Sequence, residues 1–353
     1  MTGPTLILDL AGFRENVRTL AAMVAPARTM LAVKADAYGH GAAEFATAAL
    51  EGGADSLAVL EVPAGILLRE VGFTVPLFAW LHGRDTDFAA AITADIDLGV
   101  SSMVELERIA AAVRTAGSPA SVHLKIDTGL HRNGASPEDW PALVSAARDA
   151  EREGLVRVVA LWSHLADASP ADDEAALAEF RAAVAVAAGL GVEPPLLHLA
   201  ASSAGIREPE ARLGLVRFGI AAYGISPFDD VDGRGLGLRP VMTFRAPVLA
   251  LEDGVAVLAA GSGDGVAPVT AADGAAVLLE GVRRPVLGVD VDTMTVGVDA
   301  TAGGRVTPGD VATVFGPGDD GEPTAEEWAA WAGTIGDEIV ARASRRAARV
   351  IRR

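Results

Sequence analysis

The pattern of apolar and polar positions divides the chain into two parts. In the first part, short apolar segments such as 29–34 and 56–60 alternate with stretches of helical spacing such as 102–116. This alternation is typical of parallel βα units. Eight or so such units in this length fit a closed barrel better than an open doubly wound sheet. The pattern therefore predicts a (β/α)₈ TIM-type barrel over residues 1–228.

A polar, glycine-rich segment, FDDVDGRGLG at 228–237, separates this part from the rest. The residues after it form short Val-rich segments with turn residues between them, which predicts a mainly-β domain over 236–353. The first strand, near residues 5–9, is a candidate to pack with this second domain. The final segment, 325–353, has amphipathic spacing and is predicted to be helical.

Composition narrows the classes of partner and site. The formal net charge of −18 argues against nucleic acid and anionic membranes, because phosphate binding needs clustered Lys and Arg. The chain has no cysteine, which excludes disulfides, thiolate metal sites and cysteine nucleophiles. We see no signal peptide, no apolar run of transmembrane length and no metal-ligand spacing of His and carboxylates. A cytoplasmic protein without a metal is expected.

A lysine stands where the second apolar strand ends, in the sequence LAVKADAYGHG. The carboxyl ends of barrel strands face the active site. A lysine there is partly desolvated, which lowers its pKa and makes the amine nucleophilic. Lys34 is therefore a candidate Schiff-base lysine, with Tyr38 and His40 in the loop that follows it.

Three further barrel segments carry candidate chemistry. Arg132 follows a Thr-Gly turn and can bind a carboxylate through two hydrogen bonds. His164 stands at a strand end, where a neutral imidazole can stack on or hydrogen-bond to a ring. Ser202 lies in a turn of small residues that opens a short helix, a place where backbone N–H groups and a hydroxyl bind anions.

These motifs together resemble the alanine racemase family. VKADAYGHG is similar to the family's pyridoxal 5′-phosphate (PLP) lysine motif, K-A-D/N-A-Y-G-H-G. Four more segments match in order: HLKIDTGLHRNG at 123–134, LWSHLADAS at 161–169, HLAASSAGI at 198–206 and VRFGIAAYGISP at 216–227. The resemblance extends more loosely into the second domain, through LRPVMTFRAPVLAL and TIGDEIVARAS.

The resemblance implies a cofactor and a set of roles. Lys34 would hold PLP as a Schiff base, while Tyr38, Ser202 and the backbone of Gly219 and Ile220 would bind its phosphate.

The resemblance also implies roles around the substrate. Arg132 would orient the substrate carboxylate or the cofactor phenolate, steadied by Lys125, which is carbamylated in some members. Arg217 would face the pyridine nitrogen and keep it unprotonated, because arginine stays charged.

Some positions depart from the family pattern. The second base of the family is a tyrosine in G-Y-x-D-G, donated by the neighbouring subunit, and Ser262 stands at that position in GSGDGVAP. Asp337 stands where T-I-N-Y-E has a tyrosine, Asp292 lies near a methionine position, and Ala201 replaces an asparagine.

The expected function is racemisation of a small amino acid by a homodimer with composite active sites. The second base is then Ser262, Asp264, Asp292 or a water molecule. One alternative is a one-base PLP enzyme of the same fold, a D-amino-acid lyase or aldolase or a transaminase-like enzyme. Another is a PLP-binding homologue without catalytic activity.

Overall fold

The computed structural model describes residues 3–299, 304–343 and 346–353. The chain forms two compact units, and each draws on separate stretches of sequence. We call them the barrel unit, residues 20–34 and 53–219, and the β unit, residues 1–19, 35–52 and 220–353. The domain boundaries at 228 and 236 stay a prediction.

The barrel unit is built on eight parallel strands in the order β8-β7-β6-β5-β4-β3-β2-β9. Backbone hydrogen bonds from Gly214 N to Leu197 O and from Arg217 N to Ala200 O join the β8 and β9 ends of this order. The strands are β2 (Arg28–Ala32), β3 (Ser56–Val59), β4 (Leu77–Ala79), β5 (Asp97–Val100), β6 (Ala120–Lys125), β7 (Val156–Trp162), β8 (Leu196–His198) and β9 (Leu215–Phe218).

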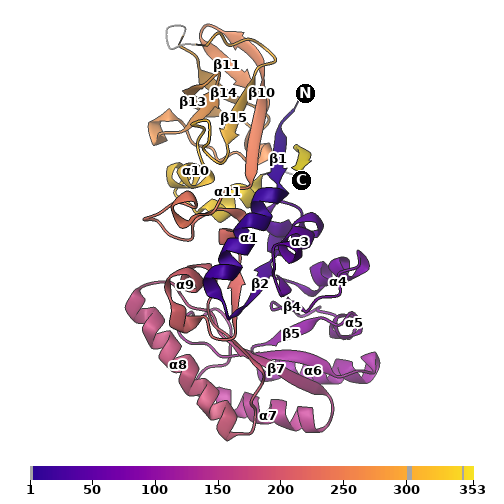
Figure 1. Ribbon diagram of the computed structural model, residues 1–353. Coiled ribbons are helices and arrows are strands. Elements are labelled where there is room, and N and C mark those ends of the chain that lie inside the picture. The colour runs from indigo at the N-terminus through magenta and orange to yellow at the C-terminus, as the bar shows by residue number, and fades with distance from the viewer. Residues whose placement is uncertain (1–2, 300–303, 344–345) are drawn as a thin grey trace. The chain divides into compact units, whose positions relative to one another are not determined.

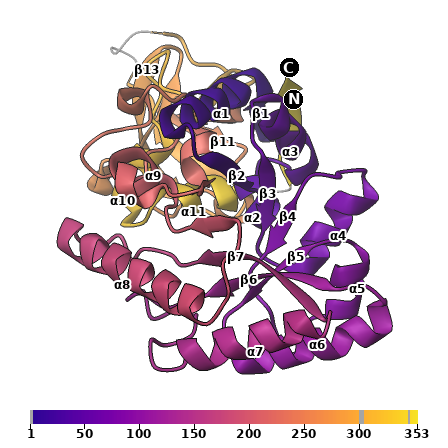
Figure 2. The ribbon, with the colours of Figure 1, turned by 60° about the horizontal axis from the view of Figure 1, so that its bottom comes forward.

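Helices cover the outer side of these strands, as Figure 2 shows for α4 to α8. Helix starts are encoded locally: the hydroxyls of Ser102 and Ser169 accept the backbone N–H three residues on. The helices that lie wholly in this unit are α4 (Val62–Glu70), α5 (Phe88–Thr93), α6 (Met103–Ala116), α7 (Trp140–Arg152), α8 (Pro170–Gly189) and α9 (Ser202–Arg207).

The β unit contains a second eight-stranded sheet, in the order β11-β14-β13-β12-β15-β10-β1-β16. Figure 1 shows β10, β11, β13, β14 and β15 gathered together, with β1 beside β10. The strands are β1 (Thr5–Asp9), β10 (Met242–Glu252), β11 (Val255–Leu258), β12 (Ala276–Leu279), β13 (Val282–Val289), β14 (Met294–Gly297), β15 (Val311–Phe315) and β16 (Ala348–Arg352). A barrel plus a mainly-β domain is thus confirmed as the fold class.

The β unit also holds α2 (Lys34–Tyr38, of which Lys34 belongs to the barrel unit), α3 (Ala42–Glu51), α10 (Ala325–Ala332) and α11 (Gly336–Arg342). Helix α1 (Leu10–Val24) begins in the β unit and ends in the barrel unit. Among the described residues, no helix is long and apolar enough to cross a membrane.

The prediction of one helix over 325–353 is wrong. Helix α10 stops because Gly333 adopts a left-handed conformation with φ 62°, and α11 ends at Arg342. Residues 348–352 form β16, which pairs in parallel with β1 from Thr5↔Ala348 to Asp9↔Arg352. Amphipathic spacing alone did not distinguish a short edge strand from a further helical turn.

Asn16 joins α1 to the segments that follow the barrel strands. Its amide Nδ2 donates to the carbonyls of Ala222 and Arg239, and its Oδ1 accepts the N–H of Arg239. The side chain is 2% exposed. Three backbone groups therefore depend on a single side chain for their hydrogen bonds.

We expect Asn16→Ala to lower the free energy of unfolding by roughly 2–4 kcal/mol, because it leaves these buried groups unpaired. Urea unfolding measures the change. Thr19→Ala, on the exposed side of the same helix, is the control and should stay within about 0.5 kcal/mol of the parent. Equal effects from both substitutions would contradict this role of Asn16.

Candidate active site

Positive charges converge on one imidazole in the barrel unit. Burial lowers the pKa of His164 well below its ordinary value, and Arg217, Arg132, Lys125 and Lys34 lower it further, in that order. These four predicted site residues are thus close enough to act on His164 together. In a chain of formal net charge −18, they make this part of the barrel suited to an anion.

Arg217, on β9, is a buried cation, at 8% exposure. Its Nη1 donates to His198 Nδ1 at 2.9 Å. Its Nη2 donates to the carbonyls of Ser163 and Leu199 and to His164 Nδ1, at 2.9, 2.8 and 3.1 Å. Because no carboxylate among the described residues forms an ion pair with it, burial lowers the pKa of Arg217 to about 9, with a smaller contribution from Arg132.

Lys125 is the last residue of β6 and is 2% exposed. Its Nζ donates to Asn133 Oδ1 and lies 4.6 Å from the ring centre of Trp162. Arg217 stands over the same ring, with its Cζ 5.3 Å from the centre. Burial, followed by the charges of Arg217 and Arg132, lowers the pKa of Lys125 to about 7. Its amine is therefore partly neutral near pH 7.

Arg132 is exposed, in a loop that Asp127 shapes. One carboxylate oxygen of Asp127 accepts the N–H groups of Gly129 and His131, at 3.1 and 3.0 Å, and the other meets His131 Nδ1 at 3.1 Å. These contacts fix the chain just before Arg132, whose guanidinium remains at the surface.

Ser202 begins α9 and is 7% exposed. Its Oγ accepts the backbone N–H of Gly219 at 3.1 Å, so its own O–H is directed away from that N–H. A side chain at Gly205 would lie 2.5 Å from Val216 Cγ1, so glycine is needed for α9 to pack against β9. Ser202 and Gly219 are thus brought together as predicted. Ile220 is buried and is the first residue of the β unit in that stretch.

The residues after Lys34 form a left-handed turn. Ala35, Asp36, Ala37 and Tyr38 have φ of 52, 56, 55 and 51°. Each such non-glycine residue costs roughly 1–2 kcal/mol relative to the right-handed form. Sequence spacing gave no signal for this strained conformation, which must be held by its surroundings.

Two side chains hold this turn. His40 Nδ1 lies 2.9 Å from Ala37 O and 3.0 Å from Tyr38 O. From β16, Arg349 Nη2 donates to Asp36 Oδ2 and to Gly39 O, both at 3.1 Å. Gly39 fits only as glycine, since a Cβ there would lie 2.6 Å from Val340 O.

Tyr38 lies in a buried aromatic cluster. Its ring centre is 4.9 Å from that of Tyr223, which lies 4.7 Å from His40 and 5.0 Å from Phe13. Burial, with a smaller contribution from Asp337, raises the pKa of Tyr38 well above its ordinary value. Its phenol therefore stays protonated and can donate a hydrogen bond at any working pH.

Ser262 lies in an exposed turn of the β unit. Its backbone N–H donates to Asp290 O, and its hydroxyl has no hydrogen bond with the residues the structure describes. Asp264 is buried, with Oδ1 3.6 Å from Arg346 Nε, and Arg346 Nη2 donates to Asp292 at 2.7 Å. The two acids considered as bases are therefore both paired with one arginine.

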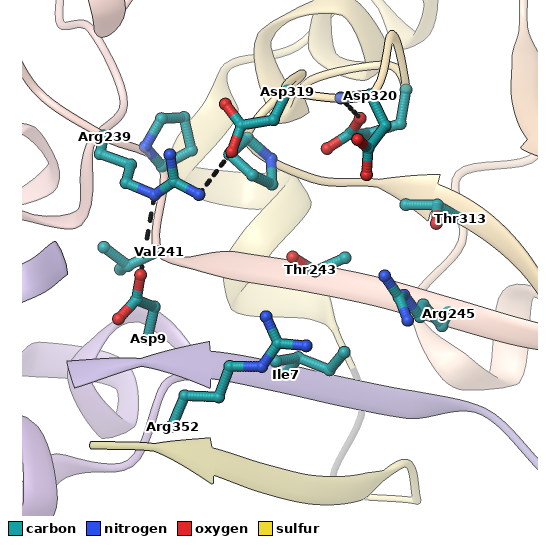
Figure 3. A pocket seen from close by; sticks show the side chains of 13 residues that line it. Ile7, Asp9, Arg239, Val241, Thr243, Arg245, Thr313, Asp319, Asp320 and Arg352 are labelled. Atoms are coloured by element: carbon teal, nitrogen blue, oxygen red, sulfur yellow. Dashed lines mark hydrogen bonds and ion pairs between the residues drawn. The ribbon is translucent and has the colours of Figure 1, made fainter. Parts of the chain in front are cut away.

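A separate pocket lies in the β unit (Figure 3). Thr243 and Arg245 of β10, Thr313 of β15 and Arg352 of β16 line it, and a loop with Asp320 borders it. At one end, Arg239 bridges Asp9 and Asp319. None of the predicted site residues lines this pocket.

The sequence analysis missed two polar residues inside the barrel, His123 and His198. They are 2% and 0% exposed, and their ring planes meet at 73°, with Nδ1 of His123 2.9 Å from Nε2 of His198. Each begins a matched motif, HLKID or HLAAS, so the motifs were a possible signal.

The donor set fits PLP. Lys34 supplies an amine for the aldehyde, and the Ser202 hydroxyl with nearby backbone N–H groups suits the phosphate. The Nη atoms of Arg217 are engaged, while its Nε makes no hydrogen bond within the described part of the chain, which leaves a donor for the pyridine nitrogen.

Comparisons with known proteins agree with this site. Residues 8–227 match the family model "Alanine racemase, N-terminal domain", and 244–351 match "Alanine racemase, C-terminal domain". The alanine racemase of Frankia casuarinae is 42% identical and that of Salinispora tropica 43%, over 97% and 95% of this chain and 94% of each relative.

Solved structures agree as well. The alanine racemase of D-cycloserine-producing Streptomyces lavendulae superposes with a TM-score of 0.94 at 37% identity, covering 100% of this chain and 98% of its own. That of Streptomyces coelicolor has a TM-score of 0.93 at 40% identity, covering 99% and 98%.

We expect Arg349→Ala to loosen the turn after Lys34, because two hydrogen bonds that hold it are lost. Amide hydrogen exchange at Gly39 and Gly41 should become about five- to tenfold faster. Arg352→Ala removes an arginine from the same strand, which makes it the matched control. Unchanged exchange in Arg349→Ala would show that the turn is held without this contact.

Proposed function

The chain belongs to the alanine racemase family, and from this we propose that it interconverts the L- and D-forms of a small amino acid, with alanine as the first candidate. It is an amino-acid racemase, and its cofactor is pyridoxal 5′-phosphate. The carrying observation is the convergence of Arg217, Arg132, Lys125 and Lys34 around His164 in an otherwise acidic chain. A phosphorylated cofactor and an amino-acid carboxylate are both anions that this arrangement attracts.

Each of these side chains then has a task. The cofactor supplies an electron sink that makes the α-proton of the amino acid acidic. Lys34 would hold the cofactor through its amine, and the same amine would take or return the α-proton of the substrate on its own side. Arg132 orients the substrate carboxylate, with Lys125 as its support.

The remaining groups hold the cofactor. Ser202, the backbone N–H groups of Gly219 and Ile220, and the Tyr38 hydroxyl would bind its phosphate. Arg217 would donate to the pyridine nitrogen and would keep it unprotonated, because a guanidinium only donates. His164, whose pKa is lowered well below its ordinary value, is neutral and would pack beside the ring of the cofactor.

The second base is the open point of this proposal. Ser262 stands at the tyrosine position of the family, and its exposed hydroxyl has no activating partner among the described residues. A hydroxyl of this kind is a far weaker acid than a phenol, whose pKa is near 10. This observation favours a second candidate function, a one-base PLP enzyme that works from the Lys34 side alone, such as a D-amino-acid lyase.

Assembly and location also remain proposals. Ser262 and Asp292 are exposed, and we propose that this surface meets the barrel site of a second copy of the chain, as a homodimer with composite sites. A cytoplasmic location stays a prediction.

α-Proton exchange in D₂O separates the two functions. With L- and D-alanine supplied separately, a racemase should show exchange and inversion from both enantiomers. Exchange from one enantiomer alone would identify a one-base enzyme. Absence of exchange, together with cleavage of a β-hydroxy amino acid, would favour the lyase.

Lys34→Ala is the control for this experiment. It should abolish the Schiff-base absorbance band and reduce exchange at least about 100-fold, the usual scale for loss of a general base. An absorbance band that survives this substitution would contradict the cofactor assignment.

Carbamylation of Lys125 should depend on pH. Only the neutral amine adds CO₂, and the pKa of about 7 makes the neutral fraction rise as pH increases through 7. At a fixed CO₂ pressure with ¹³C label, a protein carbamate signal in NMR should therefore grow between pH 6 and 8.5. Lys125→Arg should lack it, and a signal equal in both proteins would place the carbamate elsewhere.

A further inference from the structure

Four polar side chains in contact with one another, which we call the file, cross the barrel interior from β9 to β5. They are Arg217, His198, His123 and Asp97. Arg217 Nη1 lies 2.9 Å from His198 Nδ1, and His198 Nε2 lies 2.9 Å from His123 Nδ1. At its end, His123 Nε2 lies 3.5 Å from a carboxylate oxygen of Asp97, the first residue of β5. Apolar residues surround it: Met30, Ala58, Phe78, Trp162 and Leu215 form the neighbouring core.

The position of each imidazole proton in the file follows from which nitrogen atoms can donate and which must accept. An arginine guanidinium only donates, so His198 Nδ1 must accept and His198 carries its proton on Nε2. That N–H must then donate to His123 Nδ1, which leaves the proton of His123 on Nε2, directed at Asp97. If His123 donated this hydrogen bond to His198 instead, His198 would carry no proton on either nitrogen.

A doubly protonated His198 is excluded for the same reason, because its Nδ1–H would face an N–H of Arg217. Burial lowers the pKa of His198 well below its ordinary value, and Arg217 and His123 lower it further. His198 is therefore neutral, and its dipole points its lone pair at the arginine.

Aromatic rings keep both imidazoles in place. Phe78 stacks on His123 with ring centres 4.3 Å apart and planes at 16°. Trp162 stacks on His198 at 5.5 Å and 11°, and its Nε1 donates to His123 O at 3.2 Å. Rotation of either imidazole ring would break the two polar contacts that this ring makes inside the core.

We propose that His198, His123 and Asp97 are positioning residues for Arg217, which set the orientation of its guanidinium and relay the Asp97 charge toward it. This inference rests on the proposed function only in taking Arg217 as the partner of the pyridine nitrogen. A buried guanidinium with no carboxylate beside it gains from such aligned dipoles. The proton positions themselves do not depend on any cofactor.

Nitrogen-15 NMR of the histidine side chains in the cofactor-free chain tests the proton positions directly. Both His198 and His123 should carry a single proton, on Nε2, at neutral pH. His123→Asn and His82→Leu assign the signals, the latter being a partly buried histidine outside the file. A proton on Nδ1 of either ring, or on both nitrogens, would overturn the inference.

Three variants then test the effect on Arg217. His123→Asn keeps an acceptor for His198 but loses the donor to Asp97, His123→Leu loses both, and Asp97→Asn removes only the charge. We expect PLP release to accelerate in the order Asp97→Asn, His123→Asn, His123→Leu, with about tenfold in the last. His82→Leu should release PLP at the parental rate.

The NMR spectra test the proton positions, and the PLP release rates test the positioning role. Release rates that are the same in all variants would overturn the positioning role, even with the expected proton positions. A parental chain that binds no PLP would instead overturn the proposed function, and the NMR result would still decide the proton positions.

Discussion

Arg217 keeps a guanidinium inside the barrel, where water cannot solvate it and no described carboxylate pairs with it. Several groups together offset the loss of hydration of this charge. They are two backbone carbonyls, two neutral imidazoles and the face of Trp162. Carbonyl and imidazole dipoles stabilise a buried cation without neutralising it. The barrel interior is therefore polar along one line through an apolar core, and two strands on that line, β6 and β9, also carry the candidate site residues Lys125 and Arg217.

Local patterns were enough to predict a barrel followed by a mainly-β domain, and they also named part of the candidate site. Lys34 and His164 were found because each stands at the end of an apolar strand, and such ends meet in a parallel barrel. Lys125 and Arg217 were instead named through the motifs that resemble the family. His123 was missed because its side chain points into the barrel from mid-strand, and its partners come from strands distant in sequence.

Local sequence patterns could not predict conformations that depend on residues distant in the sequence. The left-handed turn at 35–38 depends on Arg349, which lies on a strand at the far end of the chain. The same strand was predicted as helix, because its pairing with β1 leaves no trace in local spacing. The sequence showed that Ser262 departs from the family pattern. Only the structure shows that the two acidic residues near it, Asp264 and Asp292, share one arginine.

The parallel pairing of β1 with β16 has a consequence for the order of synthesis. β1 is synthesised before every other strand of its sheet, yet the strand that covers one of its edges begins only at residue 348. Until then β1 presents an unpaired edge, and the turn beside Lys34 lacks the arginine that holds it. A nascent chain can therefore complete its barrel strands before Arg349 is available to hold the backbone that follows Lys34.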